Sequence, residues 1–298
     1  MSSADLKNQR TVKIINQNKQ NNQNNQFTVL AQYYDILNYL ADYKKVADYI
    51  EDIFRIYKKT PRLVLDLACG TGSLTIELNS RGYDMIGLDS SAEMLSAANM
   101  KSSGAGGRRK SDVNPDISDI SDISEISDIS DISDILWINQ DMCDFELYGT
   151  VDAVVCCFDS VNYILDDEKI KRCFSLVCNY LNPGGLFIFD VNSEYKFENI
   201  YGANDIVLEN KGVLCSWRNF YNAKSKICTF NLTLFVEQPD GRYARFDEIQ
   251  REKYYSVDFF KDILTKNNFD DINIYYDFIA NNNSIRNPAR ICFAAMVK

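Results

Sequence analysis

The chain has 298 residues, 46% of them hydrophobic, and a formal net charge of −10. This composition supports a substantial core in one large or two modest domains. Seven of the acids lie in residues 116–134, so the rest of the chain carries about −3 (−10 + 7), and neither value suggests a general nucleic-acid binder.

The residue types that are missing exclude further classes. The chain has no histidine, so the commonest metal ligand and general base is absent and no metal site is predicted. Nine cysteines without a CxxC pair favour a reducing compartment. The polar N-terminus shows no signal-peptide pattern, and no apolar run has the length of a membrane span. These features predict a cytoplasmic protein that does not enter a membrane.

The chain begins with two dissimilar segments. Residues 1–26 are rich in Asn, Gln and Lys, a composition that predicts a flexible tail. Residues 28–58 place apolar side chains at helical spacing, which predicts one or two helices.

Residues 63–72 form the most informative stretch. The apolar run that ends at Asp66 predicts a buried parallel strand, and the loop after it carries Gly70 and Gly72. Glycines allow a sharp turn and the close approach of a ligand, and free N–H groups follow at the start of the next helix. This pattern predicts a nucleotide-type cofactor site in a doubly wound sheet.

The same stretch argues against a dinucleotide. The position that needs a third glycine is Thr75, and Asp66 would repel a diphosphate. S-adenosylmethionine has an ammonium, a carboxylate and a ribose diol but no phosphate, so it suits this loop better. The second strand, residues 85–89, ends in Asp89, whose carboxylate can bind both ribose hydroxyls. Ser90 and Glu93 are predicted to form a capping box for the next helix.

Residues 101–135 contain a linker and then an Asp-Ile-Ser repeat of period three. This period fits neither a helix nor a half-buried strand. We interpret the segment as a low-complexity acidic insertion in a loop, and an acidic partner-binding segment is the alternative.

The remaining core strands are predicted at 136–140, 152–158 and 186–190, with a helix at 168–181. Consecutive antiparallel strands are predicted over 205–255, with turns at 222–224 and 239–241. A helix capped by Ser256 and closing strands at 272–278 and 291–297 complete the pattern. The predicted fold is α/β, a doubly wound, mostly parallel seven-stranded Rossmann-like sheet with an inserted small antiparallel sheet. The predicted domains are a core with an N-terminal helical lid (27–200), a substrate or lid subdomain (201–255) and the completion of the core sheet (256–298).

With this pattern the chain resembles the class I S-adenosylmethionine-dependent methyltransferases, in particular small bacterial members. The resemblance covers residues 30–298 apart from the insertion. The matching segments are Tyr33–Leu37, Asp66–Gly72, Gly87–Ser91, Asn139–Met142, Asp159–Tyr163 and Leu181–Asp190.

The resemblance implies S-adenosylmethionine as cofactor and assigns roles to residues. Asp66 and Gly70 would line its methionine end, Gly72 would allow close backbone approach, and Asp89 would hold the ribose. Asp141 would accept a hydrogen bond from the adenine amino group and the Met142 N–H would donate one. The other implied cofactor contacts are Tyr33, Tyr34, Ala68, Cys69, Ser90, Met94, Cys157 and Phe158.

The acceptor side is predicted around Asp159 and Tyr163, which we expect to act in catalysis. The alternative for Asp159 is a helix N-cap. Trp217, Arg218 and Arg251 are candidates for recognising a substrate carboxylate or ring, against ordinary packing or salt bridges.

The leading function is in-line methyl transfer to a small-molecule acceptor. The alternatives are methylation of tRNA, another RNA or a protein, and, in a different class, a protein that binds S-adenosylmethionine without turnover. A basic groove beside the pocket would favour RNA, and a narrow closed pocket would favour a small molecule.

Overall fold

The computed structural model describes residues 27, 30–105, 134–202, 204–281 and 285–298. The predicted tail and the repeat up to residue 133 lie outside the described residues. No helix among the described residues is long and apolar enough to cross a membrane.

The core is a seven-stranded sheet of order β10-β11-β5-β4-β1-β2-β3. The five adjacent strands β5, β4, β1, β2 and β3 run parallel to one another. Strand β11 is antiparallel to both of its neighbours, β5 and β10. The strands are β1 (Leu63–Leu67), β2 (Asp84–Asp89), β3 (Leu136–Asn139), β4 (Val151–Cys156), β5 (Leu181–Asn192), β10 (Phe269–Tyr276) and β11 (Arg290–Val297). The predicted fold class is therefore confirmed.

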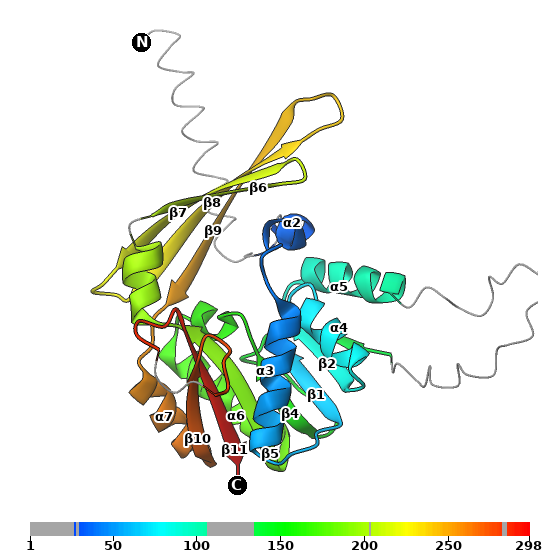
Figure 1. Ribbon diagram of the computed structural model, residues 1–298, viewed down its shortest axis with the longest axis vertical. Coiled ribbons are helices and arrows are strands. Elements are labelled where there is room, and N and C mark those ends of the chain that lie inside the picture. Colours follow the sequence, from blue (N-terminus) through cyan, green and yellow to red (C-terminus); the bar gives the residue numbers. More distant parts are fainter. Residues whose placement is uncertain (1–26, 28–29, 106–133, 203, 282–284) are drawn as a thin grey trace, which may run out of the picture.

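Helices cover both faces of this sheet (Figure 1). They are α3 (Tyr43–Ile56), α4 (Ser73–Ser80), α5 (Ala92–Ala105), α6 (Asp167–Tyr180) and α7 (Val257–Lys266). Neighbouring strand residues point to opposite faces. Val64 packs with α3 and α4, whereas Leu65 packs in the cluster that contains residues of α6 and α7. Burial on both faces explains the continuous apolar runs.

A separate four-stranded antiparallel sheet, of order β6-β7-β8-β9, lies at one end of the core (Figure 1). Its strands are β6 (Asp205–Asn210), β7 (Val213–Asn222), β8 (Ile227–Glu237) and β9 (Tyr243–Lys253). These strands and both of their predicted turns are confirmed. The short helix α2 (Leu30–Leu37) packs its Leu30 and Leu37 against the sheet, beside Cys215 and Leu232.

Polar contacts also join Phe27 and α2 to the four-stranded sheet and α2 to the core. The Glu248 carboxylate of β9 accepts hydrogen bonds from the Phe27 and Leu30 N–H groups at 2.9 and 3.2 Å. At the core end, Asp35 accepts a hydrogen bond from Thr71 Oγ1 at 2.7 Å and forms an ion pair with Lys101 Nζ at 2.5 Å. These contacts hold α2 between the core and the four-stranded sheet.

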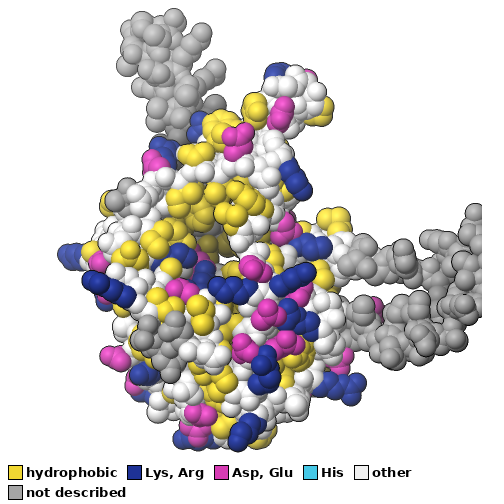
Figure 2. All heavy atoms as spheres, viewed as in Figure 1, with side chains coloured by type: hydrophobic (Ala, Val, Ile, Leu, Met, Phe, Trp, Pro, Cys, Tyr) yellow, Lys and Arg dark blue, Asp and Glu magenta, His cyan; other side chains and the backbone are white. Residues whose placement is uncertain are grey.

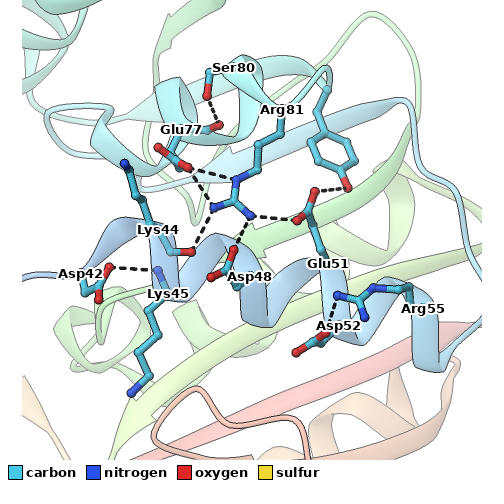
Figure 3. Close-up of polar contacts among 11 residues, drawn as sticks. Asp42, Lys44, Lys45, Asp48, Glu51, Asp52, Arg55, Glu77, Ser80 and Arg81 are labelled. Atoms are coloured by element: carbon cyan, nitrogen blue, oxygen red, sulfur yellow. Dashed lines mark hydrogen bonds and ion pairs between the residues drawn. The ribbon is translucent and has the colours of Figure 1, made fainter.

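Arg81, which follows α4, joins α4 to α3 (Figure 3). Its guanidinium lies 2.6 Å from Asp48, 2.8 Å from Glu51 and 2.9 Å from Glu77. Since the Arg81 side chain is only 19% exposed, the cluster is a half-buried network.

Three local predictions were wrong. The cap of α5 is Ser91, whose Oγ accepts a hydrogen bond from the Met94 N–H at 3.2 Å, and not Ser90. Lys101 belongs to α5, which continues to Ala105, so the predicted linker starts too early. The strand predicted from residue 186 begins at Leu181, directly after α6.

Candidate active site

A cavity of about 1370 Å³ lies between the carboxyl ends of the core strands and the inner face of the four-stranded sheet. Its lining includes Gly70 and Asp89 from the core and Leu232 and Gln250 from β8 and β9. Figure 2 shows hydrophobic side chains gathered around a hollow between the two sheets. The core part of the cavity lies where the strand order reverses, at β1 and β4, the usual ligand position in such sheets.

The loop after β1 turns through left-handed conformations at Ala68 (φ 60°), Gly70 (φ 56°) and Gly72 (φ 70°). Ala68, Cys69 and Gly70 line the cavity. Gly72 is not in the lining. A Cβ on Gly72 would lie 2.4 Å from the Trp137 ring, so packing against β3 already requires this glycine. The predicted reason for Gly72, close approach of a ligand, therefore stays a prediction.

Asp66 is 3% exposed and accepts a hydrogen bond from Thr75 Oγ1 at 2.6 Å. Burial raises the pKa of its carboxyl to about 7, although the bond from Thr75 opposes that rise. Thr75, which occupies the place of a third glycine, thus holds the acid in position. A carboxyl group that is desolvated in this way favours a cationic ligand.

Asp89 lies at the carboxyl end of β2 and lines the cavity. Its carboxylate accepts hydrogen bonds at 2.8 Å from the N–H groups of Gly70 and Ser91, which fix its orientation. Burial raises the pKa of Asp89 despite these bonds. The Asp89 carboxylate therefore joins the glycine loop to the start of α5, and both segments fix its position in the cavity wall.

Most of the other predicted cofactor residues also line this cavity. Those in the lining are Tyr34, Ser90, Met94, Asp141, Met142, Cys157 and Phe158. Tyr33 is not in the lining, and its ring lies 6.3 Å from that of Phe246. The Tyr33 ring thus lies beside β9, and its contact with the cofactor stays a prediction.

Asp159 and Tyr163 both line the cavity, but each is already engaged. Asp159 forms an ion pair with Arg290 at 2.7 Å and caps no helix with its side chain. Burial alone would raise the pKa of Asp159, but the charges of Arg290 and Lys196 lower it to about 2. The Tyr163 hydroxyl donates a hydrogen bond to Gln250 at 3.2 Å, and burial raises its pKa well above the ordinary value. Neither side chain is a ready proton acceptor at neutral pH.

The polar groups around Asp159 were missed by the sequence analysis. Asn192 donates hydrogen bonds to Asp159 at 3.1 Å and to Glu252 at 2.6 Å. Lys196 Nζ donates to Asn192 Oδ1 at 2.8 Å, and Arg290 also pairs with Asp190. These residues come from β5, β9, β11 and a π-helix at Lys196–Tyr201. Only the weak signal of polar residues at the ends of apolar runs could have indicated them.

Of the three predicted substrate-recognition residues in the four-stranded sheet, one lines the cavity and two do not. Trp217 lines the cavity, and its Nε1 is buried without a hydrogen-bond partner among the described residues. Arg218 is exposed, and neither Arg218 nor Arg251 is in the lining. Because side chains alternate along a strand, these arginines lie on the other side of the sheet from Trp217 and Gln250.

Comparisons with known proteins identify the family of the chain. A family model described as a methyltransferase domain matches residues 58–226. A putative methyltransferase of Geobacillus sp. (strain WCH70) is 27% identical over 249 residues, which is 83% of this chain and 90% of that one. A crystal structure of an S-adenosylmethionine-dependent methyltransferase from Clostridium acetobutylicum ATCC 824 aligns with a TM-score of 0.73 and 28% identity, over 92% of this chain and 99% of that one.

A more distant relative carries a more specific name. It is an amino-sugar N,N-dimethyltransferase of Streptomyces venezuelae, 27% identical over 163 residues, 54% of this chain and 56% of that one.

The chain therefore belongs to the methyltransferase domain family. It is an S-adenosylmethionine-dependent methyltransferase, and S-adenosylmethionine is its cofactor. The residues fit this group, since the buried Asp66 and the half-buried Asp89 flank a glycine loop whose Gly70 N–H donates a hydrogen bond to the Asp89 carboxylate.

Proposed function

We propose that the protein methylates a small molecule that enters the cavity between the core and the four-stranded sheet. The observation that carries this proposal is the charge of the lining. Among the described residues, seven acidic and three basic side chains line the cavity. An acidic lining repels the phosphates of an RNA, for which a basic groove is expected.

The size of the cavity supports the same proposal. Its volume of about 1370 Å³ exceeds the range of roughly 300–1,000 Å³ for single-ligand pockets. It therefore has room for the cofactor and a small acceptor together. The name of the Streptomyces venezuelae relative, an amino-sugar N,N-dimethyltransferase, supports this acceptor class.

For the cofactor we propose that Asp89 binds the ribose diol and that Asp66 and Gly70 line the methionine end. Asp141 and Met142 would bind the adenine, and Tyr34 would cover the site from α2. When bound, the cofactor would supply a methyl group carried on a sulfonium, and the sulfur would be left as a neutral thioether once the acceptor has taken the methyl group.

For the acceptor side we propose that Asp159 and Tyr163 position the substrate. Their hydrogen bonds and pKa values suit positioning better than proton removal. Alignment and exclusion of water then supply most of the rate, which agrees with a chain that lacks histidine.

A radiolabelled-methyl assay tests the proposal. The protein is incubated with labelled S-adenosylmethionine and a cell extract, which is then separated into small-molecule, RNA and protein fractions. We expect label in the small-molecule fraction, and much less label with Asp89→Ala as the matched control. Label that depends on the enzyme but appears in RNA or protein would contradict the proposal.

A further inference from the structure

The part of the cavity that is lined by β7 and the π-helix has an aromatic wall. Trp217 of β7 and Tyr201 of the π-helix both line the cavity, and their rings stack at 6.1 Å between centroids. Lys196, at the start of the same π-helix, places its Nζ 4.9 Å from the centroid of the Tyr201 ring. The wall therefore combines apolar ring surface with one ammonium group.

The other charged groups beside this wall are already neutralised. The Asp159 carboxylate pairs with Arg290 at 2.7 Å, and Arg290 also pairs with the buried Asp190. Glu252 is 1% exposed, and burial together with the charge of Asp159 raises its pKa well above the ordinary value. Burial therefore disfavours the charged form of Glu252, and the charge of Asp159 is balanced by Arg290.

Lys196 differs from these groups because its contacts are neutral. An ammonium group has three hydrogen-bond donors. One of them is directed at the Asn192 amide oxygen at 2.8 Å, and the Tyr201 ring lies beside the same Nζ. Among the described residues, Lys196 forms no ion pair within 4.0 Å. Lys196 lines the cavity and is the charged group of this wall with donors left unused by the described residues.

We propose that Lys196 binds a carboxylate of the methyl acceptor, with the rings of Trp217 and Tyr201 packing against the apolar part beside it. This inference rests on the proposed function, since it concerns the same acceptor. A carboxylate accepts a charge-assisted hydrogen bond from an ammonium group that has an unused donor. A phosphate dianion fits less well, because the lining is otherwise mostly acidic.

Fluorine NMR with matched probes tests this inference without a known acceptor. The protein is loaded with S-adenosylhomocysteine and titrated with 4-fluorobenzoate, 4-fluorobenzamide and 4-fluorobenzylammonium. These probes share a ring that suits the aromatic wall and differ in charge. We expect the benzoate to bind about tenfold more tightly than the benzamide, as a hydrogen bond to a charged group implies. The benzylammonium should bind no better than the benzamide.

Variants assign the effect to one side chain. Lys196→Met should reduce benzoate binding to the benzamide level and leave the benzamide unchanged, whereas Lys196→Arg should keep the preference. Lys226→Met is the matched control, because Lys226 lies over the Tyr254 ring at 5.1 Å but outside the cavity lining. Melting temperature and S-adenosylhomocysteine affinity, measured for each variant, show whether the fold is intact.

The outcomes separate this inference from the proposed function. Tighter binding of the benzylammonium, or benzoate binding unchanged in a folded Lys196→Met, would overturn the inference. Methylated products in the small-molecule fraction that all lack a carboxylate would overturn it as well, and would leave the proposed function standing. Label in RNA would instead remove the proposed function.

Discussion

The buried carboxyl group of Asp66 should make the protein without cofactor less stable as the pH rises. Its pKa is about 7, against an ordinary value of 3.8, because burial disfavours the charged form. Between these two values the folded protein keeps a proton that the unfolded chain has released. The stabilisation is therefore fully present below about pH 4 and is lost as the pH rises through 7.

The size of this effect follows from the two pKa values. They differ by about three pH units, and each unit corresponds to about 1.4 kcal/mol, so the free energy of unfolding should fall by roughly 4 kcal/mol. The bond from Thr75 Oγ1 at 2.6 Å already opposes the rise of the pKa and is included in the value of 7.

Asp66→Asn tests this reasoning, because the amide keeps the shape and does not titrate. Urea denaturation from about pH 4.5 to about pH 8 should show a shallower decline of stability for Asp66→Asn than for the wild type. Asp144→Asn is the control, since Asp144 is an exposed acid on the surface. If Asp66→Asn and the wild type declined in parallel over this range, the assignment of a pKa near 7 to Asp66 would be refuted.

Three further predictions follow from the contacts. Asp89→Ala removes the acceptor for the Gly70 and Ser91 N–H groups. Calorimetry should show that the affinity for S-adenosylmethionine falls by at least about tenfold. An unchanged affinity would refute the assignment of Asp89 to the ribose. Arg81→Met leaves Glu51 and Glu77 without their shared cation (Figure 3) and should cost about 1–3 kcal/mol in urea denaturation. Arg242→Met, which removes an 85% exposed partner of Asp240, should cost less than about 0.5 kcal/mol; equal losses would contradict the role of Arg81. Deleting residues 107–132 should leave the melting temperature within about 2 °C and the cofactor affinity unchanged. The reason is that the deletion starts after α5 has ended at Ala105 and stops before β3 begins at Leu136. A large loss of melting temperature or of affinity would show that the repeat is structural.

The sequence predicted well those features that depend on neighbouring residues. The apolar run before Asp66, the glycines after it and the alternation within the four-stranded sheet each act over a few residues, and the structure confirms the elements they indicate. Local patterns can also mislead at their boundaries. Ser90 and Ser91 are both suitable caps, and only the hydrogen bond to Met94 distinguishes them.

The acceptor side could not be predicted in the same way, because its contacts join distant parts of the chain. Arg290 follows Asp159 by 131 positions, and Glu252 follows its donor Asn192 by 60. The sequence predicts a catalytic role for Asp159, whereas pairing with Arg290 helps to hold its pKa at about 2. Such an effect depends on burial and tertiary contact, which no local pattern contains.

The central claim is that Asp66, the Gly70 loop and Asp89 together hold S-adenosylmethionine within the cavity. A crystal structure of the protein with S-adenosylhomocysteine tests it most directly. The account predicts the ribose hydroxyls at the Asp89 carboxylate, the amino-acid end beside Asp66 and Gly70, and the sulfur facing the side of the cavity that contains Asp159. Electron density for the ligand at another surface, or a ribose bound without Asp89, would contradict it.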